Sequence, residues 1–202
     1  MPPLPFQGAA TKLADADIAR AAAALGCAPA AVRAVLKVET GGKGGFLPDG
    51  RPRILFEAHL FSRATGGRYD AGHPAISAPS WNRKLYAGGA GEYDRLAAAV
   101  ALDRTAALAS ASWGLFQILG SNFRECGHAD VEAFVAAMVS GEGAQLDAFV
   151  NYVRRRKLDD ELREGRWADF ARAYNGPAYA ANQYDTKLAA AFAAAQPETA
   201  LA

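Results

Sequence analysis

The sequence is poor in the residues that bind metals and form disulfides. Its 202 residues include 2 cysteines and 3 histidines. Cys27 and Cys126 belong to no Cys-x-x-Cys or Cys/His cluster, and His59, His73 and His128 lack metal-ligand spacing. These patterns exclude a metal site, a dithiol redox centre and a disulfide framework. Whether Cys27 pairs with Cys126 stays open.

The sequence also lacks a charge excess of one sign and a long hydrophobic run. It has 22 basic and 21 acidic residues and a formal net charge of +1, which gives no electrostatic footprint for nucleic acid. No apolar stretch is long enough to span a bilayer, and residues 1–8 lack the basic and apolar regions of a signal peptide. We therefore expect a soluble chain made in the cytoplasm, without nucleic-acid partners or stable membrane insertion.

Alanine and other hydrophobic residues dominate what is present. Hydrophobic residues make up 51% of the chain and charged residues 21%, which is typical of globular proteins. Alanine favours helix more than any other residue, and the length suits one domain with a substantial core. We expect a single domain over residues 1–202 that is mostly α-helical, with a loose arm at residues 1–10.

The β pattern is confined to one region. Residues 46–57 combine apolar runs with the turn signal Pro48-Asp49-Gly50 and predict a β-hairpin or a three-stranded sheet. Residues 65–91 are rich in Gly, Pro, Ser and aromatic residues, which is typical of a long surface loop. The expected fold class is α+β, mainly α, with one small sheet. Helical segments are predicted over residues 15–25, 29–40, 92–110, 113–119, 131–138, 143–157 and 167–174 and after residue 185.

Glu39 is a candidate general acid. The helix predicted from Pro29 ends at Gly41-Gly42, and Glu39 lies in its last turn on the face of Val35 and Leu36. A carboxyl on an apolar face is desolvated, which raises its pKa, and a protonated carboxyl can donate to a glycosidic oxygen as the bond breaks. Taken alone, a glutamate in a last turn is more often exposed or paired.

Glu57 is a candidate second carboxylate, because it follows the apolar run Ile54-Leu55-Phe56. Glycoside hydrolysis typically uses two carboxyl groups. At about 6.5 to 9.5 Å they admit a water and invert the configuration, whereas at about 5 to 5.5 Å the second attacks and the configuration is retained. A surface carboxylate that pairs with Arg51 or Arg53 is an equally good interpretation.

Two further motifs combine polar side chains with tight turns. The segment Ser112-Trp113-Gly114-Leu115-Phe116-Gln117-Ile118 contains an amide that can both donate to and accept from an acetamido group, and Gly114 permits a close approach. The segment Ala173-Tyr174-Asn175-Gly176-Pro177 has the composition of a helix end, where Tyr174 could hydrogen-bond the catalytic carboxyl or a sugar. Packing and capping explain both motifs equally well.

Trp81 and Tyr86 are candidate substrate-binding residues in the predicted loop. Aromatic rings exposed in a Gly-rich loop can stack on sugar rings. Arg83 and Lys84 lie between them in the sequence, and solvation explains these two cations better than ligand binding does.

Taken in order, these blocks resemble a known pattern. A glutamate at a helix end, then Gly-Leu-Phe-Gln-Ile, then Ala-Tyr-Asn-Gly is the motif order of goose-type lysozymes and soluble lytic transglycosylases. More closely, the chain resembles the N-acetylmuramidase family found in phage endolysins, over about residues 15–195. The matching blocks are residues 38–42, 46–57, 110–118 and 174–177.

The resemblance implies a lysozyme-like fold and no cofactor. It also implies hydrolysis of the β-1,4 bond between N-acetylmuramic acid and N-acetylglucosamine in peptidoglycan. It gives Glu39 the role of general acid and Glu57 a role in positioning water or stabilising charge. We expect Gln117, Tyr174 and Asn175 to bind the sugar. Two alternatives stay open: a lytic transglycosylase, in which the muramic 6-hydroxyl replaces water, and a non-catalytic wall-binding module.

The chain departs from the family pattern in two respects. Thr40 stands where many relatives have Ser, and the chain has no room for the separate peptidoglycan-binding module that family endolysins often have. We expect a monomer that is made in the bacterial cytoplasm and acts on the cell wall after release, as an endolysin or as a delivered toxin.

Overall fold

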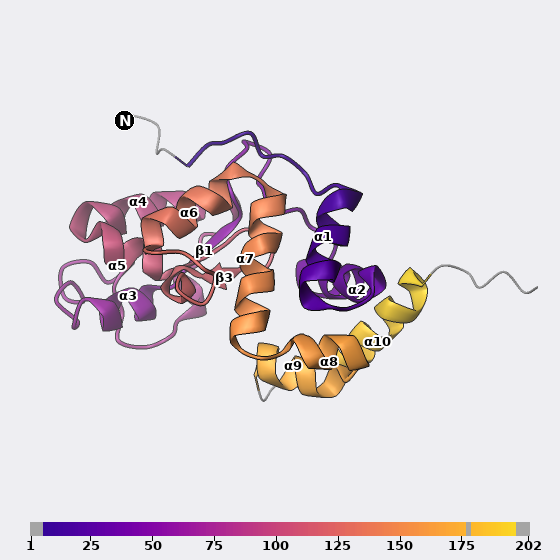
Figure 1. Ribbon diagram of the computed structural model, residues 1–202. Coiled ribbons are helices and arrows are strands. Elements are labelled where there is room, and N and C mark those ends of the chain that lie inside the picture. The colour runs from indigo at the N-terminus through magenta and orange to yellow at the C-terminus, as the bar shows by residue number, and fades with distance from the viewer. Residues whose placement is uncertain (1–5, 177–178, 197–202) are drawn as a thin grey trace, which may run out of the picture. The chain divides into compact units, whose positions relative to one another are not determined.

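The computed structural model describes residues 6–176 and 179–196 as a mainly helical chain with one small sheet (Figure 1). The chain divides into two compact units. Unit 1 contains the described residues up to Lys12 and Gly44–Phe149, and unit 2 contains Leu13–Lys43 and the described residues from Val150 onward. The expected fold class, α+β and mainly α, is confirmed. A single catalytic domain over the whole chain stays a prediction.

Unit 1 contains the sheet. Its strands β1 (Ile54–Phe56), β2 (Ala111–Trp113) and β3 (Ile118–Leu119) are antiparallel and lie in the order β1-β2-β3. The helices of this unit are α3 (Ala58–Ala64), α4 (Glu92–Leu102), α5 (Arg104–Ala109), α6 (Val131–Ser140) and the first part of α7 (Glu142–Arg155), and short 3-10 turns lie at η1 (Arg83–Leu85), η2 (Gly89–Gly91) and η3 (Gly120–Asn122).

The sheet has three strands, as one of the two expectations stated, but only β1 comes from residues 46–57 and the other two strands come from residues 111–119. Residues 46–57 do not form a hairpin, because Phe46 and Pro52 make a single isolated bridge and β1 pairs with β2 instead. Residues 113–119, which we expected to be helical, belong to the β2–β3 hairpin. The prediction was wrong because a short buried apolar run does not distinguish a strand from a helix.

One predicted helix is broken. Residues 92–110 form α4 and α5 because the backbone of Asp103 is extended, with φ −157°, and its carboxylate caps α5 by accepting from the N–H of Ala106 at 3.0 Å. The long loop predicted over residues 65–91 is confirmed, since this segment contains turns and two 3-10 turns only. The helices α3 and α8 (Asp159–Glu164) were not predicted.

An aromatic cluster anchors the start of the described chain in the core of unit 1. Phe6 packs against Tyr93 and Trp113, with ring centroids 5.8 and 5.6 Å apart. Phe6 is 1% exposed, and full burial of such a ring stabilises a fold by about 1.5–3 kcal/mol. The arm predicted over residues 1–10 is therefore not loose at Phe6, and residues 1–5 of that prediction lie outside the described residues.

Unit 2 is helical and contains Glu39. Its helices are α1 (Asp15–Leu25), α2 (Pro29–Thr40), the end of α7, α8, α9 (Trp167–Asn175) and α10 (Tyr184–Ala195). The bounds of α1 and α2 confirm the prediction: Pro29 is the first residue of α2, and Gly41 ends it in the left-handed conformation at φ +55°. α10 packs along α2 although the two are far apart in the sequence (Figure 1).

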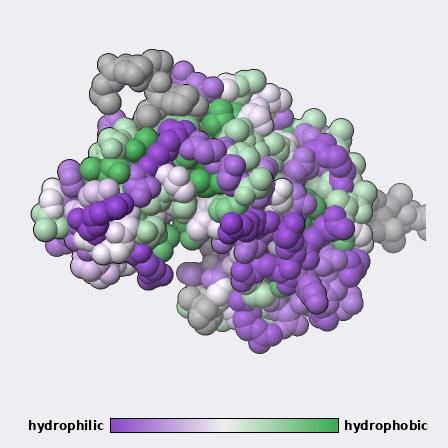
Figure 2. All heavy atoms as spheres, turned by 60° about the vertical axis from the view of Figure 1, so that its left-hand side comes forward, coloured by the Kyte–Doolittle hydropathy of each residue, from purple (hydrophilic) through white to green (hydrophobic). Residues whose placement is uncertain are grey.

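The surface is largely polar. Hydrophilic side chains dominate the face in Figure 2, with hydrophobic ones interspersed. Among the described residues, Trp81 is the one large hydrophobic side chain that is exposed, at 60%. No single described helix is long and apolar enough to cross a membrane, and α1 and α2 meet that length and composition only as a pair bent by 109°.

Candidate active site

Glu39 lies in the last turn of α2, and its side chain is half-buried. Its Oε1 accepts a hydrogen bond of 3.1 Å from Nδ2 of Asn175, the last residue of α9. Burial raises the pKa of the Glu39 carboxyl, and the Asn175 hydrogen bond offsets part of this rise because it stabilises the carboxylate. The pKa remains raised, as the role of proton donor near neutral pH requires.

Tyr184, the first residue of α10, is a further polar neighbour of Glu39. Burial raises the pKa of the Tyr184 phenol, and the negative charge of Glu39 raises it further. The phenol therefore keeps its proton beside the carboxylate and can serve as a donor. We had placed the start of this helix after Asp185, and no motif in the sequence singled out Tyr184.

Tyr174 occupies an aromatic cluster of unit 2. Its ring stacks on Phe170, with centroids 5.5 Å apart and planes at 8°, and meets Tyr152 edge-on at 5.9 Å. The residue of this motif that hydrogen-bonds Glu39 is Asn175, for which we expected a contact with the sugar. A sugar contact for Tyr174 or Asn175 stays a prediction.

Glu57 lies in unit 1, between the end of β1 and the start of α3. Its Oε2 accepts a hydrogen bond of 2.6 Å from the Tyr86 hydroxyl and lies 3.3 Å from Nδ1 of His59. These contacts replace the alternative pairing with an arginine, since Arg51 pairs with Asp49 and Arg53 donates to the carbonyl of Gly44. No motif in the sequence indicates the contact between His59 and Glu57.

The two aromatic residues of the predicted loop lie next to each other. The rings of Trp81 and Tyr86 meet at 67°, with centroids 6.4 Å apart. Burial raises the pKa of the Tyr86 phenol to about 12, and the hydrogen bond to Glu57 contributes to the rise. Tyr86 is thus engaged with the carboxylate, whereas Trp81 presents its ring to solvent.

Gln117 uses its side chain within the β2–β3 hairpin. Its Oε1 accepts from the hydroxyl of Ser112 at 3.1 Å, and its Nε2 donates to the carbonyls of Gly114 and Arg53 at 2.8 and 3.2 Å. These bonds support a left-handed backbone, φ +48°, that costs a non-glycine residue about 1 kcal/mol or more. A sugar contact for Gln117 stays a prediction. Because the bonds above use both N–H groups of Nε2, the side chain could accept from a sugar only through the second lone pair of Oε1.

The start of α7 fixes two glycine turns of unit 1. The carboxylate of Glu142 accepts from the N–H of Gly45 at 2.8 Å, and Oε1 of Gln145 accepts from the N–H of Leu115 at 2.7 Å. A Cβ at Gly45 would lie 2.0 Å from Gln145, and one at Gly114 would lie 2.6 Å from it. The close approach expected at Gly114 is therefore present, and the group that approaches is a buried amide.

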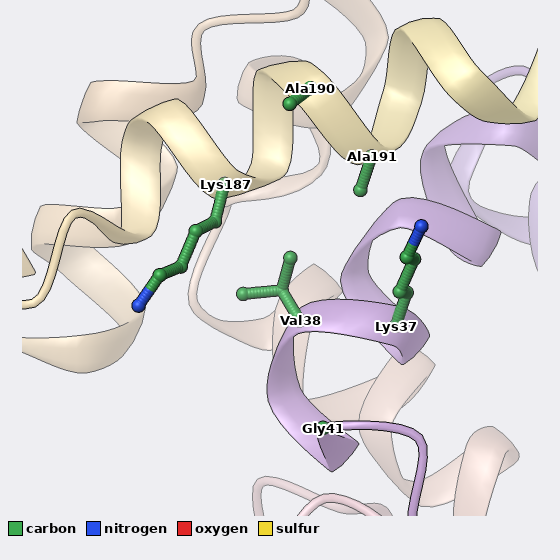
Figure 3. Close-up of a pocket in the computed structure, with 6 residues that line it drawn as sticks. All are labelled: Lys37, Val38, Gly41, Lys187, Ala190 and Ala191. Carbon is green, nitrogen blue, oxygen red and sulfur yellow. The ribbon is translucent and has the colours of Figure 1, made fainter.

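A pocket of about 440 Å³ opens in unit 2 between α2 and α10. Figure 3 shows the amino groups of Lys37 and Lys187 at opposite ends of its lining, with Val38 and two alanines between. None of the lining residues is a carboxylate, so the pocket offers no proton donor of the kind that Glu39 provides. The lining residues are Lys37, Val38, Gly41, Lys187, Ala190 and Ala191.

The described residues contain no group of three or more His, Cys, Asp or Glu side chains that could hold a metal ion, and Cys27 and Cys126 are not bonded to each other. The structure brings Glu39 together with Asn175, and Glu57 with Tyr86. Of the predicted site residues, unit 2 holds Glu39, Tyr174 and Asn175, and unit 1 holds Glu57, Trp81, Tyr86 and Gln117.

Comparison with known proteins places all of these residues within one matched region. Residues 28–196 match the family model described as N-acetylmuramidase. No curated protein matches the chain. A solved structure that does is the crystal structure of a Burkholderia AP3 phage endolysin, with a TM-score of 0.85 and 47% sequence identity over 91% of this chain and 71% of that chain.

Proposed function

This chain belongs to the N-acetylmuramidase family, whose members are glycoside hydrolases of the lysozyme type, and we propose that it is an endolysin that degrades bacterial peptidoglycan. The bond we assign to it is the β-1,4 linkage between N-acetylmuramic acid and N-acetylglucosamine. The observation that supports this assignment most is the Glu39 carboxyl, which lies within the matched region and has a pKa that burial raises.

In the proposed reaction Glu39 is the general acid. Its carboxyl transfers a proton to the glycosidic oxygen as the bond to the sugar C1 breaks, because the departing alkoxide needs that proton. Glu39 becomes a carboxylate in this step, and the side-chain amide of Asn175, at 3.1 Å, then donates to a charged oxygen. A hydrogen bond to a charged acceptor is about twice as strong as one to a neutral acceptor, so Asn175 stabilises the product of the proton transfer.

We propose that Glu57 helps to activate the attacking water. Both of its contacts, with Tyr86 and His59, are made by Oε2. Among the described residues no hydrogen bond to Oε1 occurs, so this oxygen keeps its lone pairs for the attacking water or for the positive charge that develops at C1. The exposed ring of Trp81 is proposed to stack on a sugar of the bound strand.

The proposed setting of the reaction follows from the substrate. The partner is a peptidoglycan glycan strand, and we propose that a monomer acts on the cell wall after its release from the cytoplasm. Neither nucleic acid nor a membrane is a proposed partner, since the basic and acidic residues balance at 22 and 21.

Product analysis tests the assigned bond. Purified peptidoglycan is digested with the full chain, and the soluble fragments are identified by mass spectrometry after reduction. We expect reducing N-acetylmuramic acid ends. Fragments with 1,6-anhydromuramic ends would move the protein to the lytic transglycosylases, reducing N-acetylglucosamine ends would assign the other glycosidic bond, and tight binding to sacculi without fragments would leave the wall-binding alternative.

A further inference from the structure

Glu92, the first residue of α4, is a fully buried carboxylate that the reaction above does not use. Its side chain is 0% exposed. Its Oε1 accepts hydrogen bonds from the N–H groups of Ala87 and Gly88 at 2.8 and 2.9 Å, and its Oε2 accepts from the N–H of Phe56 at 3.1 Å. A buried charge is costly unless it is paired and hydrogen-bonded, and these backbone donors supply part of that compensation.

Arg95, one turn further along α4, supplies the opposite charge. Its Nη1 donates to Oε2 of Glu92 and to the carbonyl oxygen of Phe56, each at 2.8 Å. Its guanidinium lies over the rings of Phe56 and Tyr86, 5.2 and 5.8 Å from their centroids. The ion pair thus contacts both the strand β1 and the loop that precedes α4.

The backbone N–H groups that donate to Glu92 belong to residues beside Tyr86 and Glu57 in the sequence. Phe56 directly precedes Glu57, and Ala87 directly follows Tyr86. One carboxylate therefore ties together the strand end and the loop from which these two side chains project. The 2.6 Å hydrogen bond between the Tyr86 hydroxyl and Glu57 requires those two backbone segments to keep their spacing.

We propose that Glu92 is a positioning residue for the hydrolysis: by fixing the backbone beside Tyr86 and Glu57, it orients the Glu57 carboxylate toward the attacking water. This inference rests on the proposed role of Glu57. A solely structural Glu92 would stabilise the fold without setting the geometry of the Tyr86–Glu57 pair, and the two roles predict different measurements.

The test is Glu92→Gln, with Glu132→Gln as its matched control. Glu132 is an exposed glutamate of unit 1 whose ion pair with Arg104 has the same chemical type. We expect Glu92→Gln to lower kcat on peptidoglycan by about 10- to 100-fold with little change in KM, because misplacement of a catalytic group by about 1 Å costs up to roughly 10²-fold in rate. The control should keep wild-type kcat.

A second measurement follows the Tyr86 phenol by ultraviolet titration, with each protein compared with its own Tyr86→Phe derivative. Burial and the Glu57 contact raise the pKa of Tyr86 to about 12, and loss of the pair should move its ionisation toward the ordinary value of about 10. A role confined to stability would leave this titration where it is in the wild type.

Combination with Glu57→Gln separates this inference from the function proposed above. If Glu92 acts through Glu57, adding Glu92→Gln to Glu57→Gln costs no further kcat. If Glu57→Gln alone keeps full kcat, the proposed role of Glu57 is wrong, and the Tyr86 titration then decides whether Glu92 fixes the Tyr86–Glu57 pair.

A second variant is used if the unpaired Arg95 prevents Glu92→Gln from folding. The double variant Glu92→Gln with Arg95→Met removes the buried cation, and the same kcat and Tyr86 titration are measured on it. A folded variant with an unchanged Tyr86 titration, or with wild-type kcat where Glu57→Gln lowers it, overturns the proposal.

Discussion

Two opposing effects act on the Glu39 carboxyl at the scale of single residues. Burial disfavours the carboxylate and raises the pKa, while the side-chain amide of Asn175 favours the carboxylate and lowers the pKa. The first effect is the larger. The pH at which Glu39 loses its proton is therefore set by its surroundings in unit 2, and changes to those surroundings should shift the pH dependence of the reaction.

Asn175→Ala should move the alkaline limb of the activity profile toward higher pH. The substitution removes a donor that stabilises the carboxylate, so the Glu39 pKa rises and the acid form persists to higher pH. The measurement is the pH dependence of the peptidoglycan cleavage rate for the wild type and the variant. A limb that moves to lower pH, or does not move, contradicts the account of Glu39.

Glu39→Gln should raise the thermal stability at pH 7 to 8. The folded-state pKa of Glu39 is raised, so the folded chain binds this proton more tightly than the unfolded chain. The corresponding stability is complete below the unfolded pKa of about 4.3 and is lost as the pH rises through the folded pKa. Glutamine does not ionise, so the variant does not lose this stability as the pH rises. Its Tm should therefore exceed that of the wild type at pH 7 to 8 and match it near pH 4. An equal Tm at both pH values would show that Glu39 is not desolvated.

The sequence indicates Glu39 and, through its motif, Asn175, but it does not indicate Tyr184 or His59. The carboxylate falls on an apolar helix face beside Val35 and Leu36, which is a local pattern and can be read directly. Tyr184 comes near Glu39 through folding, whereas His59 lies two residues after Glu57 in the sequence but belongs to no motif that marks it as a contact of that carboxylate. The sequence does not indicate a special role for Glu92 either, because an acidic residue at the start of a helix is ordinarily explained by the helix dipole.

At the scale of elements, α2 was predictable and the β2–β3 hairpin was not. Pro29 and Gly41 mark the ends of α2 through their own backbone preferences. The hairpin depends instead on Gln117, which adopts a left-handed backbone with support from bonds to Ser112, Gly114 and Arg53. Only Arg53 among these partners is distant in sequence, but the apolar run between Trp113 and Ile118 gives no sign of the left-handed backbone that the three bonds support.

Gly114→Ala should destabilise unit 1 by about 2 kcal/mol or more. The added Cβ would lie 2.6 Å from the buried Gln145 side chain, and φ is +69°, a region that costs a non-glycine residue about 1 kcal/mol. Gly50→Ala is the matched control, because its φ is +81° but no atom lies within 4 Å of the new Cβ. Denaturant unfolding should show the larger loss for Gly114→Ala. Equal losses would mean that the Gln145 contact does not restrict this turn.

At the scale of the whole molecule, each unit is built from two separate stretches of the chain. Residues 13–43 and the described residues from 150 onward form unit 2, while the segment between them belongs to unit 1, so the two proposed carboxylates come from different units. The 18-residue spacing of Glu39 and Glu57 could be read from the sequence, but their division between units could not, since it depends on the packing of α2 against α10, late in the chain.

The most direct test of the central claim is the lytic activity of Glu39→Gln on purified peptidoglycan. Release of soluble muropeptides is measured for the wild type and the variant at equal concentrations of folded protein, with the fold checked by circular dichroism. The account predicts that the variant folds and loses at least about 10²-fold of the rate, the lower range for loss of a general acid. A folded Glu39→Gln that releases muropeptides at the wild-type rate would contradict the assignment of Glu39 as the proton donor.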